Sequence, residues 1–358
     1  MVPLIKGFES HKNIRSVLCV TGQHREMLDQ VLSSHSIVPD FDLNLMKPGQ
    51  TLSQLSSSIL LGLEPVLDKV KPDWVFVHGD TATTAAASLA AYYKTIPVAH
   101  VEAGLRTYDI YSPWPEESNR RIAGVVSTCH FAPTETAKSN LLAEGVKSGS
   151  IVVTGNTVID ALDMALKKIE SSLMMSQQCD EKIPRLDPDK KLVVVTGHRR
   201  ESFGEGFENI CQALVKLSKR DDVQIIYPVH LNPYVKKVVT EKLSGQANIH
   251  LIEPLDYLAF IRLLSRAYII ISDSGGIQEE APSLGIPLLV TRETTERPEV
   301  IDIGAVKLVG HDKDKIVSHA ITLLENSSAY AAMSNCENPY GDGRAVDRII
   351  NHLLNRPT

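Results

Sequence analysis

The chain has 358 residues, which is enough for two domains of ordinary size. Its hydrophobic content of 43% and charged content of 22% are typical of a globular protein, and no apolar run approaches the ~18 residues of a transmembrane helix. The formal net charge of -6 argues against a binder of nucleic acid or anionic membranes. We therefore expect neither partner, and we expect anions to bind only at local sites.

The five cysteines are scattered along the chain and include no C-x-x-C pair. This usage is typical of a reducing cytosol, and it gives no zinc-binding pattern. The first residues have too short an apolar core for a signal peptide. The 12 histidines form no H-E-x-x-H motif or Cys/His cluster. We therefore expect a cytoplasmic protein without a metal site.

The N-terminal half of the chain alternates short apolar runs with segments of helical spacing. Strands are predicted at 17–20, within 40–46, and at 74–77, 96–101, 130–132 and 151–153. Helices are predicted over 1–11, 24–31 and 51–70, in an Ala-rich segment that ends at 93, over 116–126, and from 134 onward. This alternation predicts a parallel sheet with helices on both faces.

The same alternation starts again after residues 171–190, a polar stretch with two prolines that we interpret as a linker. Further strands are predicted at 192–195, 223–227, 248–251, 268–271, 287–290 and 305–308. The domains are therefore expected at 1–170 and 191–340, with a final helix in 341–358 that packs back toward the N-terminal domain. The predicted class is α/β, with two Rossmann-like, doubly wound domains and a ligand cleft between them at the carboxyl ends of the strands.

The stretch 268–285, YIIISDSGGIQEEAPSLG, joins a buried strand to a helix through a glycine turn. Ser274 suits the N-cap of that helix, and Gly275 and Gly276 let a ligand approach the backbone closely. The first N–H groups of a helix lack intrahelical partners, and the helix dipole favours negative charge there. The stretch thus predicts a phosphate site, although an ordinary capped helix explains the same residues.

Two carboxylates, Glu279 and Glu280, follow one turn into this helix. A carboxylate that faced a bound phosphate would repel it. We therefore expect one of the two to accept hydrogen bonds from ribose hydroxyls instead.

Charged and polar residues follow most of the predicted strands. They are Asp80, Glu102, Glu116, Arg120, His198, Arg199, Arg200, Glu201, His230 and Ser274. Each carboxylate alone is explained by a helix cap or a surface charge, and Glu116 with Arg120 by an i,i+4 surface ion pair. Three acids and several bases at successive strand ends make one shared site the better explanation.

An NAD site is not predicted, because it needs G-x-G-x-x-G between a strand and a helix. Gly204-Glu205-Gly206 comes nearest, but it lacks the third glycine and lies well after its strand. We therefore expect no cofactor.

With these residues in place, the chain resembles the non-hydrolysing UDP-N-acetylglucosamine 2-epimerases of bacteria, and the resemblance covers almost the whole sequence. The stretches that carry it are TGQHREML (21–28), VHGDTATT (77–84), HVEAGLRT (100–107), SPWPEESNR (112–120), TGNTVIDAL (154–162), TGHRRESFG (196–204), PVHLNP (228–233), SDSGGIQEEAPSLG (272–285), TTERPE (294–299) and NPYGDG (338–343). The resemblance implies a GT-B-like fold, a homodimer, and reversible conversion of UDP-GlcNAc to UDP-ManNAc in the cytoplasm for surface-polysaccharide synthesis.

The family's reaction eliminates UDP to give 2-acetamidoglucal and then adds it back with the C2 proton on the other face. By residue-to-residue match, the resemblance implies that Asp80, Glu102 and Glu116 are the acid/base carboxylates. The resemblance also implies that His198 lies beside the diphosphate and assists the departure of UDP. It implies that Arg120 helps to hold the charges of the site. Which carboxylate removes the proton stays open.

For the nucleotide, the resemblance implies that Ser274, Gly275 and Gly276 bind the diphosphate. Glu280 would take the ribose hydroxyls, and Phe260 would lie near uracil. The family opens with a strand and a Gly-Thr-Arg-Pro-Glu turn that this sequence lacks. We therefore expect a gap in the N-terminal sheet, with 17–20 and 74–77 missing a shared neighbour.

Three other functions stay open from the sequence. A UDP-sugar glycosyltransferase of the same fold would share the nucleotide site but would not need three carboxylates in the N-terminal domain. A hydrolysing 2-epimerase would release free ManNAc. An inactive UDP-sugar-binding form is the non-enzymatic alternative.

Overall fold

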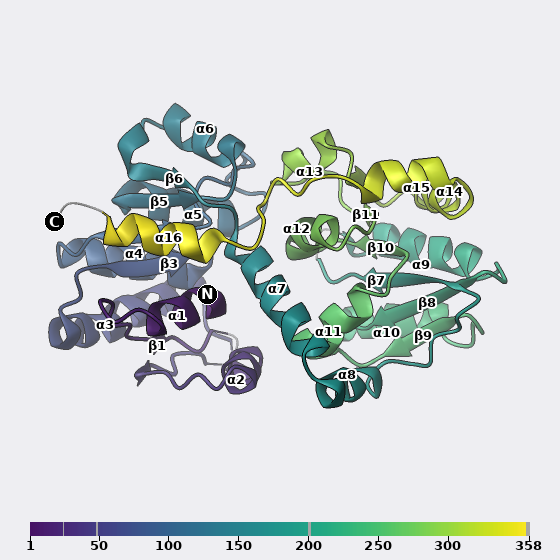
Figure 1. The fold of residues 1–358 in the computed structure, drawn as a ribbon, viewed down its shortest axis with the longest axis horizontal. Coiled ribbons are helices and arrows are strands. Elements are labelled where there is room, and N and C mark those ends of the chain that lie inside the picture. Colours follow the sequence, from purple (N-terminus) through teal and green to yellow (C-terminus); the bar gives the residue numbers. More distant parts are fainter. Residues whose placement is uncertain (24, 48, 200–201, 356–358) are drawn as a thin grey trace. The chain divides into compact units, whose positions relative to one another are not determined.

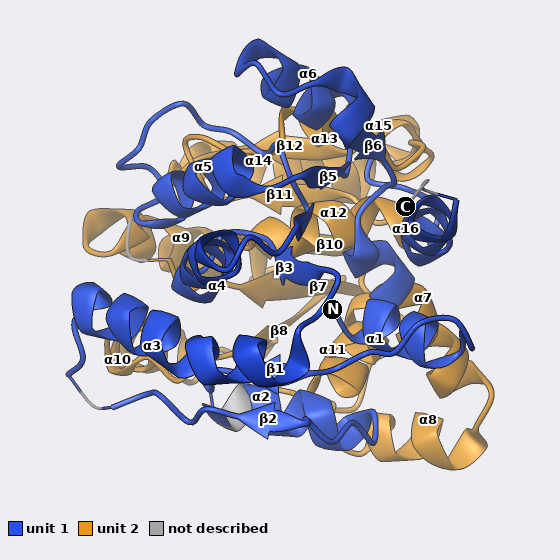
Figure 2. Cartoon of the chain, turned by 90° about the vertical axis from the view of Figure 1, so that its left-hand side faces the viewer, with its two compact units in different colours: residues 1–161, 340–358 blue, residues 162–339 orange. Residues whose placement is uncertain are grey.

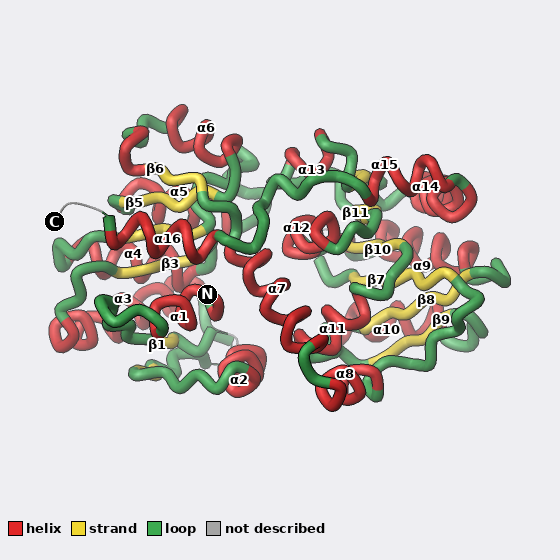
Figure 3. The backbone as a smooth tube through the Cα atoms, viewed as in Figure 1, coloured by secondary structure: helices red, strands yellow, loops and turns green. Residues whose placement is uncertain are grey.

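The computed structural model describes residues 1–23, 25–47, 49–199 and 202–355, and these form two compact units (Figure 2). Unit 1 comprises Met1–Ala161 and Tyr340–Thr358, and unit 2 comprises Leu162–Pro339. In both units, strands alternate with helices along the chain, as Figures 1 and 3 show. Within the described ranges, no helix is long and apolar enough to span a membrane.

Unit 1 contains a four-stranded parallel sheet and a separate parallel pair. The strands are β3 (Val75–His78), β4 (Val98–Val101), β5 (Cys129–Ala132) and β6 (Ile151–Val153), in that order, and the pair β1 (Cys19–Val20) and β2 (Phe41–Asp42). In the described part of the chain, no ladder joins β1 to β3. The β1–β2 pair and the four-stranded sheet are therefore separate sheets among the described residues.

Helices cover the strands of unit 1, and their starts follow sequence signals. They are α1 (Val2–Glu9), α2 (Arg25–Ser34), α3 (Leu52–Val70), α4 (Ala82–Tyr93), α5 (Glu116–Val126), α6 (Glu135–Ala143), the beginning of α7 (Thr157–Glu170), and α16 (Ala345–Leu354). Thr51 and Gln54 form a reciprocal capping box at the start of α3, and Thr134 caps α6. The small side chains of α4 are buried, so this helix packs closely against α3.

The C-terminal helix α16 belongs to unit 1 although it comes last in the sequence. In Figure 1 it runs beside α1 across the sheet, and the two helices are in contact. Ile349 and Ile350 join Phe131 of β5 in one buried cluster. Asp160 of α7 accepts the first backbone N–H groups of α16, from Ala345 at 3.1 Å and Val346 at 2.9 Å. The short helix α16 is thus held in place by its buried apolar side chains and by the cap that Asp160 of α7 provides.

Unit 2 contains a six-stranded parallel sheet. Its strands are β7 (Lys191–Thr196), β8 (Val223–Pro228), β9 (Ile249–Ile252), β10 (Ile269–Ser272), β11 (Leu288–Val290) and β12 (Val306–Leu308). The spatial order is β9-β8-β7-β10-β11-β12, the doubly wound order in which the chain reverses direction between its first and fourth strands. The carboxyl ends of β7 and β10 therefore flank the switch point where such folds bind ligands.

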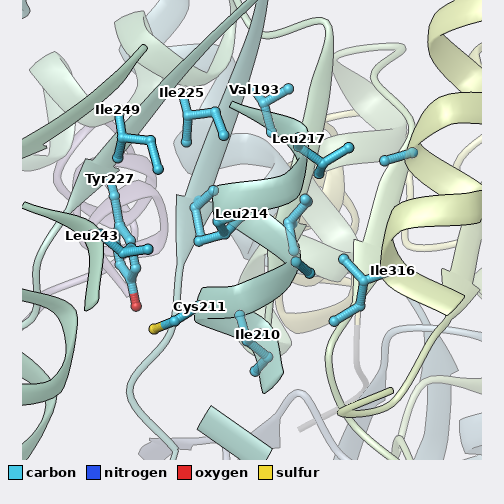
Figure 4. Packing of buried hydrophobic residues seen from close by; sticks show 14 of the residues in the cluster. Val193, Ile210, Cys211, Leu214, Leu217, Ile225, Tyr227, Leu243, Ile249 and Ile316 are labelled. Atoms are coloured by element: carbon cyan, nitrogen blue, oxygen red, sulfur yellow. The ribbon is translucent and has the colours of Figure 1, made fainter. Parts of the chain in front are cut away.

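The helices of unit 2 bury the sheet on both faces. They are the end of α7, α8 (Leu173–Asp180), α9 (Glu205–Leu217), α10 (Pro233–Leu243), α11 (Tyr257–Leu264), α12 (Gly275–Ser283), α13 (Pro298–Asp302), α14 (Lys313–Glu325) and α15 (Ser327–Ser334). Figure 4 shows Leu214 and Leu217 of α9 packed against Val193 and Ile225 of the sheet. The stretch 171–190, interpreted as a linker, contains the helix α8, whose first turn is capped by Ser172.

Candidate active site

The side chains of Asp80 and Arg120 are in contact in unit 1. Asp80 follows β3, and Arg120 lies on α5 with only 3% of its surface exposed. The Nε atom of Arg120 donates to Asp80 Oδ2 at 3.1 Å, and Nη2 donates to the same oxygen. The partners of the arginine are Asp80 and Glu117, so the hypothesis of a surface ion pair between Arg120 and Glu116 is wrong.

Glu117 also contacts Arg120, although the sequence analysis did not single it out. Its carboxylate is fully buried and accepts from Nη1 of Arg120 at 3.1 Å. It also accepts the backbone N–H groups of Thr107 at 3.1 Å and Tyr108 at 3.3 Å, which ties the loop after β4 to α5. The i,i+3 spacing from Arg120 was the available signal, but that spacing is common on surface helices.

Glu102 follows β4 and lies beside the residue that precedes Asp80. Its backbone has a φ of 63°, and its Oε1 accepts from Nδ2 of Asn156 at 3.1 Å. A Cβ at Gly79 would stand 2.8 Å from Oε2 of Glu102, so only glycine leaves room for this carboxylate. The fold therefore brings Asp80 and Glu102 to neighbouring strand ends.

Glu116 is the first residue of α5, one turn before Arg120. Its Oε2 atom is buried and has no hydrogen-bond partner among the described residues. A helix N-terminus favours negative charge, so the position suits a carboxylate. A buried oxygen without a protein partner is available to accept a proton or a ligand hydroxyl.

In unit 2, α12 begins immediately after β10, with Ser274 at the N-cap as predicted. The Ser274 hydroxyl makes no capping bond; instead, Ser272 Oγ accepts the backbone N–H of Ser274 at 3.0 Å. A Cβ at Gly276 would meet no atom within 4 Å, whereas one at Gly275 would meet the Arg297 guanidinium at 2.8 Å. Gly276 therefore leaves the start of α12 open to an anion, and Gly275 makes room for an arginine of the protein.

The two carboxylates of α12 have different partners. Glu279 accepts from Nε of Arg297 at 2.5 Å, and Arg297 also pairs with Glu296, a buried residue that accepts from Arg292 at 3.0 Å. This buried network was not predicted, because its members come from two separate stretches of the chain. Because Glu279 pairs with Arg297, Glu280 is the one of these two carboxylates that is available to a ligand.

Glu280 is buried, and its Oε1 accepts from the hydroxyl of Tyr257 on α11 at 3.1 Å. Burial raises the pKa of Glu280 to about 7, although the Tyr257 hydrogen bond works in the opposite direction. Phe260 lies one turn after Tyr257 on the same helix. Its predicted place near uracil stays a prediction.

His198 follows β7 and is held by Asp273, which follows the neighbouring strand β10. The Nδ1 atom of His198 lies 3.2 Å from Asp273 Oδ1, and its side chain is 42% exposed. The ring of His230, after β8, stacks on it with 5.2 Å between centroids. Arg200 and Glu201, which the sequence also placed here, lie outside the described residues.

The comparisons with known proteins agree with one another. The UDP-N-acetylglucosamine 2-epimerase family model matches residues 6–354. The UDP-N-acetylglucosamine 2-epimerase of Escherichia coli strain K12 is 54% identical over 356 residues, covering 99% of this chain and 95% of that protein. A probable UDP-N-acetylglucosamine 2-epimerase of Ralstonia nicotianae is 55% identical over 350 residues, covering 98% and 93% respectively.

Among solved structures, the Neisseria meningitidis UDP-GlcNAc 2-epimerase bound to UDP-GlcNAc matches with a TM-score of 0.96 and 51% identity. The match covers 99% of this chain and 96% of that one. It confirms the predicted α/β class with two Rossmann-like domains of GT-B type. The resemblance inferred from the motifs is also confirmed, and the chain belongs to the UDP-N-acetylglucosamine 2-epimerase family.

Proposed function

We propose that this chain interconverts UDP-GlcNAc and UDP-ManNAc by inverting the configuration at C2 of the sugar. Family membership over residues 6–354 supports the proposal. The observation that carries it is the group of carboxylates in unit 1: Asp80 on buried Arg120, Glu102 beside Gly79, and Glu116 with an unpartnered oxygen. A glycosyltransferase of the same fold has no need of three such groups at these strand ends.

The sugar's C2 proton is not next to a carbonyl group, so direct deprotonation is prohibitively slow. In the proposed route a carboxylate takes this proton, a C1=C2 double bond forms, and the C1–O bond breaks with its electrons passing to UDP. The reverse addition delivers a proton to the other face of C2. Asp80, Glu102 and Glu116 supply the proton transfers, and Arg120 fixes the carboxylate of Asp80.

Unit 2 supplies the nucleotide half of the proposal. Ser274 is the N-cap of α12 and Gly275 and Gly276 are its first residues, and the backbone N–H groups at a helix start suit a diphosphate. Glu280 accepts the ribose hydroxyls, and Phe260 on α11 contacts uracil. His198 assists the departing diphosphate.

The test is to incubate the protein with UDP-GlcNAc in D₂O and follow the products by NMR. UDP-ManNAc with deuterium at C2 is the expected product, with slow release of UDP and 2-acetamidoglucal on long incubation. Free ManNAc would indicate a hydrolysing epimerase, and transfer to an added sugar acceptor would indicate a glycosyltransferase. UDP-ManNAc without deuterium at C2 would exclude the elimination route.

We also propose that the protein acts as a homodimer in the cytoplasm, in the synthesis of surface polysaccharide. The dimer rests on the resemblance of the motifs to the family, and light scattering that gives the mass of one chain would overturn it. The cytoplasmic location is supported by the five free cysteines. Fractionation that places the protein outside the cytoplasm would contradict it.

Substituting Gly276 by Ala should weaken UDP binding by about tenfold or more, ~1.4 kcal/mol, while the melting temperature stays close to that of the wild type. The reason is that a methyl group at Gly276 meets no protein atom but stands where a phosphate would approach α12. Calorimetry with UDP measures the effect. Gly149→Ala is the control, because its added methyl group also meets no atom within 4 Å. Unchanged UDP affinity in Gly276→Ala would contradict the phosphate site.

The affinity for UDP should fall as the pH drops below about 7, because protonated Glu280 loses its charged acceptor for the ribose hydroxyls. Tyr257→Phe removes a hydrogen bond that lowers the pKa of Glu280, so the fall should begin at higher pH. Calorimetric titrations with UDP at several pH values measure both effects. Glu280→Gln is the control, because it lacks the titrating carboxyl group. It should keep only the pH dependence that ionisation of UDP causes in every variant. If Glu280→Gln keeps the pH dependence of the wild type, Glu280 is not its source.

A further inference from the structure

Asp273 ties together the two strand ends at the switch point of unit 2. It directly follows β10, which pairs with β7 so that Ser272 lies opposite Thr196. Its Oδ2 atom accepts the backbone N–H groups of His198 and Arg199, both at 2.8 Å. Arg199 in turn donates from Nε to the backbone carbonyl of Asp273 at 3.0 Å. Two hydrogen bonds therefore fix the backbone at His198 to Asp273, and the Arg199 side chain adds a third.

The second carboxylate oxygen of Asp273 faces the imidazole of His198. Asp273 is 1% exposed, and its Oδ1 lies 3.2 Å from Nδ1 of His198. The contact is an ion pair when the imidazole is protonated, although Oδ1 has no aligned hydrogen-bond donor among the described residues. Burial would raise the pKa of Asp273, but His198 and the two backbone N–H groups outweigh it and hold that pKa below its usual value. A buried carboxylate in this position requires a proton on the nitrogen that faces it.

A second imidazole lies against the ring of His198. His230 stacks on it at 5.2 Å with 21° between the ring planes. The pKa of His230 is lowered, first by burial and then by His198. Because Nδ1 faces Asp273, Nε2 lies on the side of the imidazole away from the carboxylate.

We propose that Asp273 is a positioning residue that keeps a proton on Nδ1 of His198 and so presents Nε2 to the leaving diphosphate. The proposal rests on the proposed function, in which His198 assists the departure of UDP. During elimination, the electron pair of the C1–O bond passes to a phosphate oxygen, and Nε2–H of the imidazolium donates a hydrogen bond to that oxygen. Asp273 stays ionised throughout, and no proton leaves Nδ1.

The decisive measurement is the protonation of the His198 ring in wild-type protein. ¹⁵N NMR of labelled histidine, assigned by comparison with His198→Gln, reports which ring nitrogen carries hydrogen. We expect Nδ1 of His198 to remain protonated across the pH range in which the protein is folded. An unprotonated Nδ1 in the neutral ring would overturn the proposal, whatever the turnover of the enzyme. This result does not depend on the reaction, so it is distinguishable from failure of the proposed function, which the products of UDP-GlcNAc decide.

Asp273→Asn supplies the second test. The Asn side-chain oxygen can still accept the N–H groups of His198 and Arg199, but its amide now donates toward Nδ1 and favours the other tautomer. We expect the neutral ring to carry its proton on Nε2, where it can still donate to the diphosphate, but to lose the positive charge that the Asp273 carboxylate stabilises. Because the imidazolium charge is what stabilises the departing UDP, kcat should fall by roughly 10²–10³-fold, with a smaller change in KM. Asp312→Asn is the matched control, because Asp312 also accepts two backbone N–H groups, at the start of α14. An unchanged His198 tautomer together with unchanged kcat in a folded Asp273→Asn protein would contradict the proposal.

Discussion

Glu102→Gln should retain UDP binding and lose epimerisation by about 10²–10⁴-fold, the usual cost of removing one general acid or base. Glutamine can still accept the hydrogen bond of Asn156 through its carbonyl oxygen, so the local geometry is preserved. It cannot take up a proton. The loss should therefore appear in kcat, while the proposed UDP site on unit 2 is untouched.

Asp80→Asn and Glu116→Gln extend the test to the other carboxylates. Asp80→Asn also removes the charge that Arg120 pairs with, so an effect on stability is expected beside the effect on turnover. Glu116→Gln disturbs no hydrogen bond of Oε2, which has no partner in the described part of the chain. The exposed Glu135 of α6 provides the control Glu135→Gln.

Turnover of UDP-GlcNAc, deuterium entry at C2 and UDP calorimetry should be measured on all four variants. A variant that still exchanges the C2 proton but accumulates UDP and 2-acetamidoglucal has lost the re-addition step. Near-normal turnover in Glu102→Gln would remove Glu102 from the chemistry. Weakened UDP binding with normal turnover at saturation would assign it to binding instead.

Much of the fold follows from apolar periodicity in the sequence. The runs at 192–195 and 269–271 predict β7 and β10 to within one residue at either end, because parallel strands buried on both faces read as unbroken apolar segments. The helix over 51–70 was predicted by its apolar spacing, and in the structure Thr51 caps it. The helix α8 was missed, because its polar sequence and the nearby prolines resemble a linker.

The site was predicted less completely, because ion pairs depend on distant elements. Sequence spacing suggested Glu116 as the partner of Arg120, but the fold supplies Asp80 from another strand end. Asp273 lies within the motif that predicts the diphosphate site, yet its partner His198 lies 75 positions earlier in the chain. Local sequence can indicate that a charged residue matters, but only the strand order determines what it contacts.

Acid should destabilise unit 1 through two histidines on neighbouring strands. His100 of β4 and His130 of β5 lie opposite each other in the ladder, and their side chains are buried. Burial is the largest cause that lowers the pKa of His100 to about 3 and that of His130 to about 4. Both rings are therefore neutral in the folded protein at pH values where they are charged in the unfolded chain.

The direction of the effect follows from proton linkage. Because the folded pKa values lie below the unfolded value of ~6.5, the stability contributed by each histidine is fully present above about pH 6.5 and is lost as the pH falls. At about pH 5 each histidine lowers the free energy of unfolding by ~2 kcal/mol relative to its value above about pH 6.5. The pair together lowers it by roughly 4 kcal/mol. This is a large part of the ~5–15 kcal/mol by which a domain is stable.

Urea unfolding of unit 1, followed by the fluorescence of Trp74 and Trp114, should be measured at about pH 7.5 and about pH 5. His130→Gln and His100→Gln replace each ring with an amide that does not titrate in this range. Each should reduce the difference in unfolding free energy between the two pH values by ~2 kcal/mol, even if it lowers stability at both. The control is His319→Gln, at a partly exposed position on α14. A pH difference that survives unchanged in both variants would show that other groups cause the acid sensitivity.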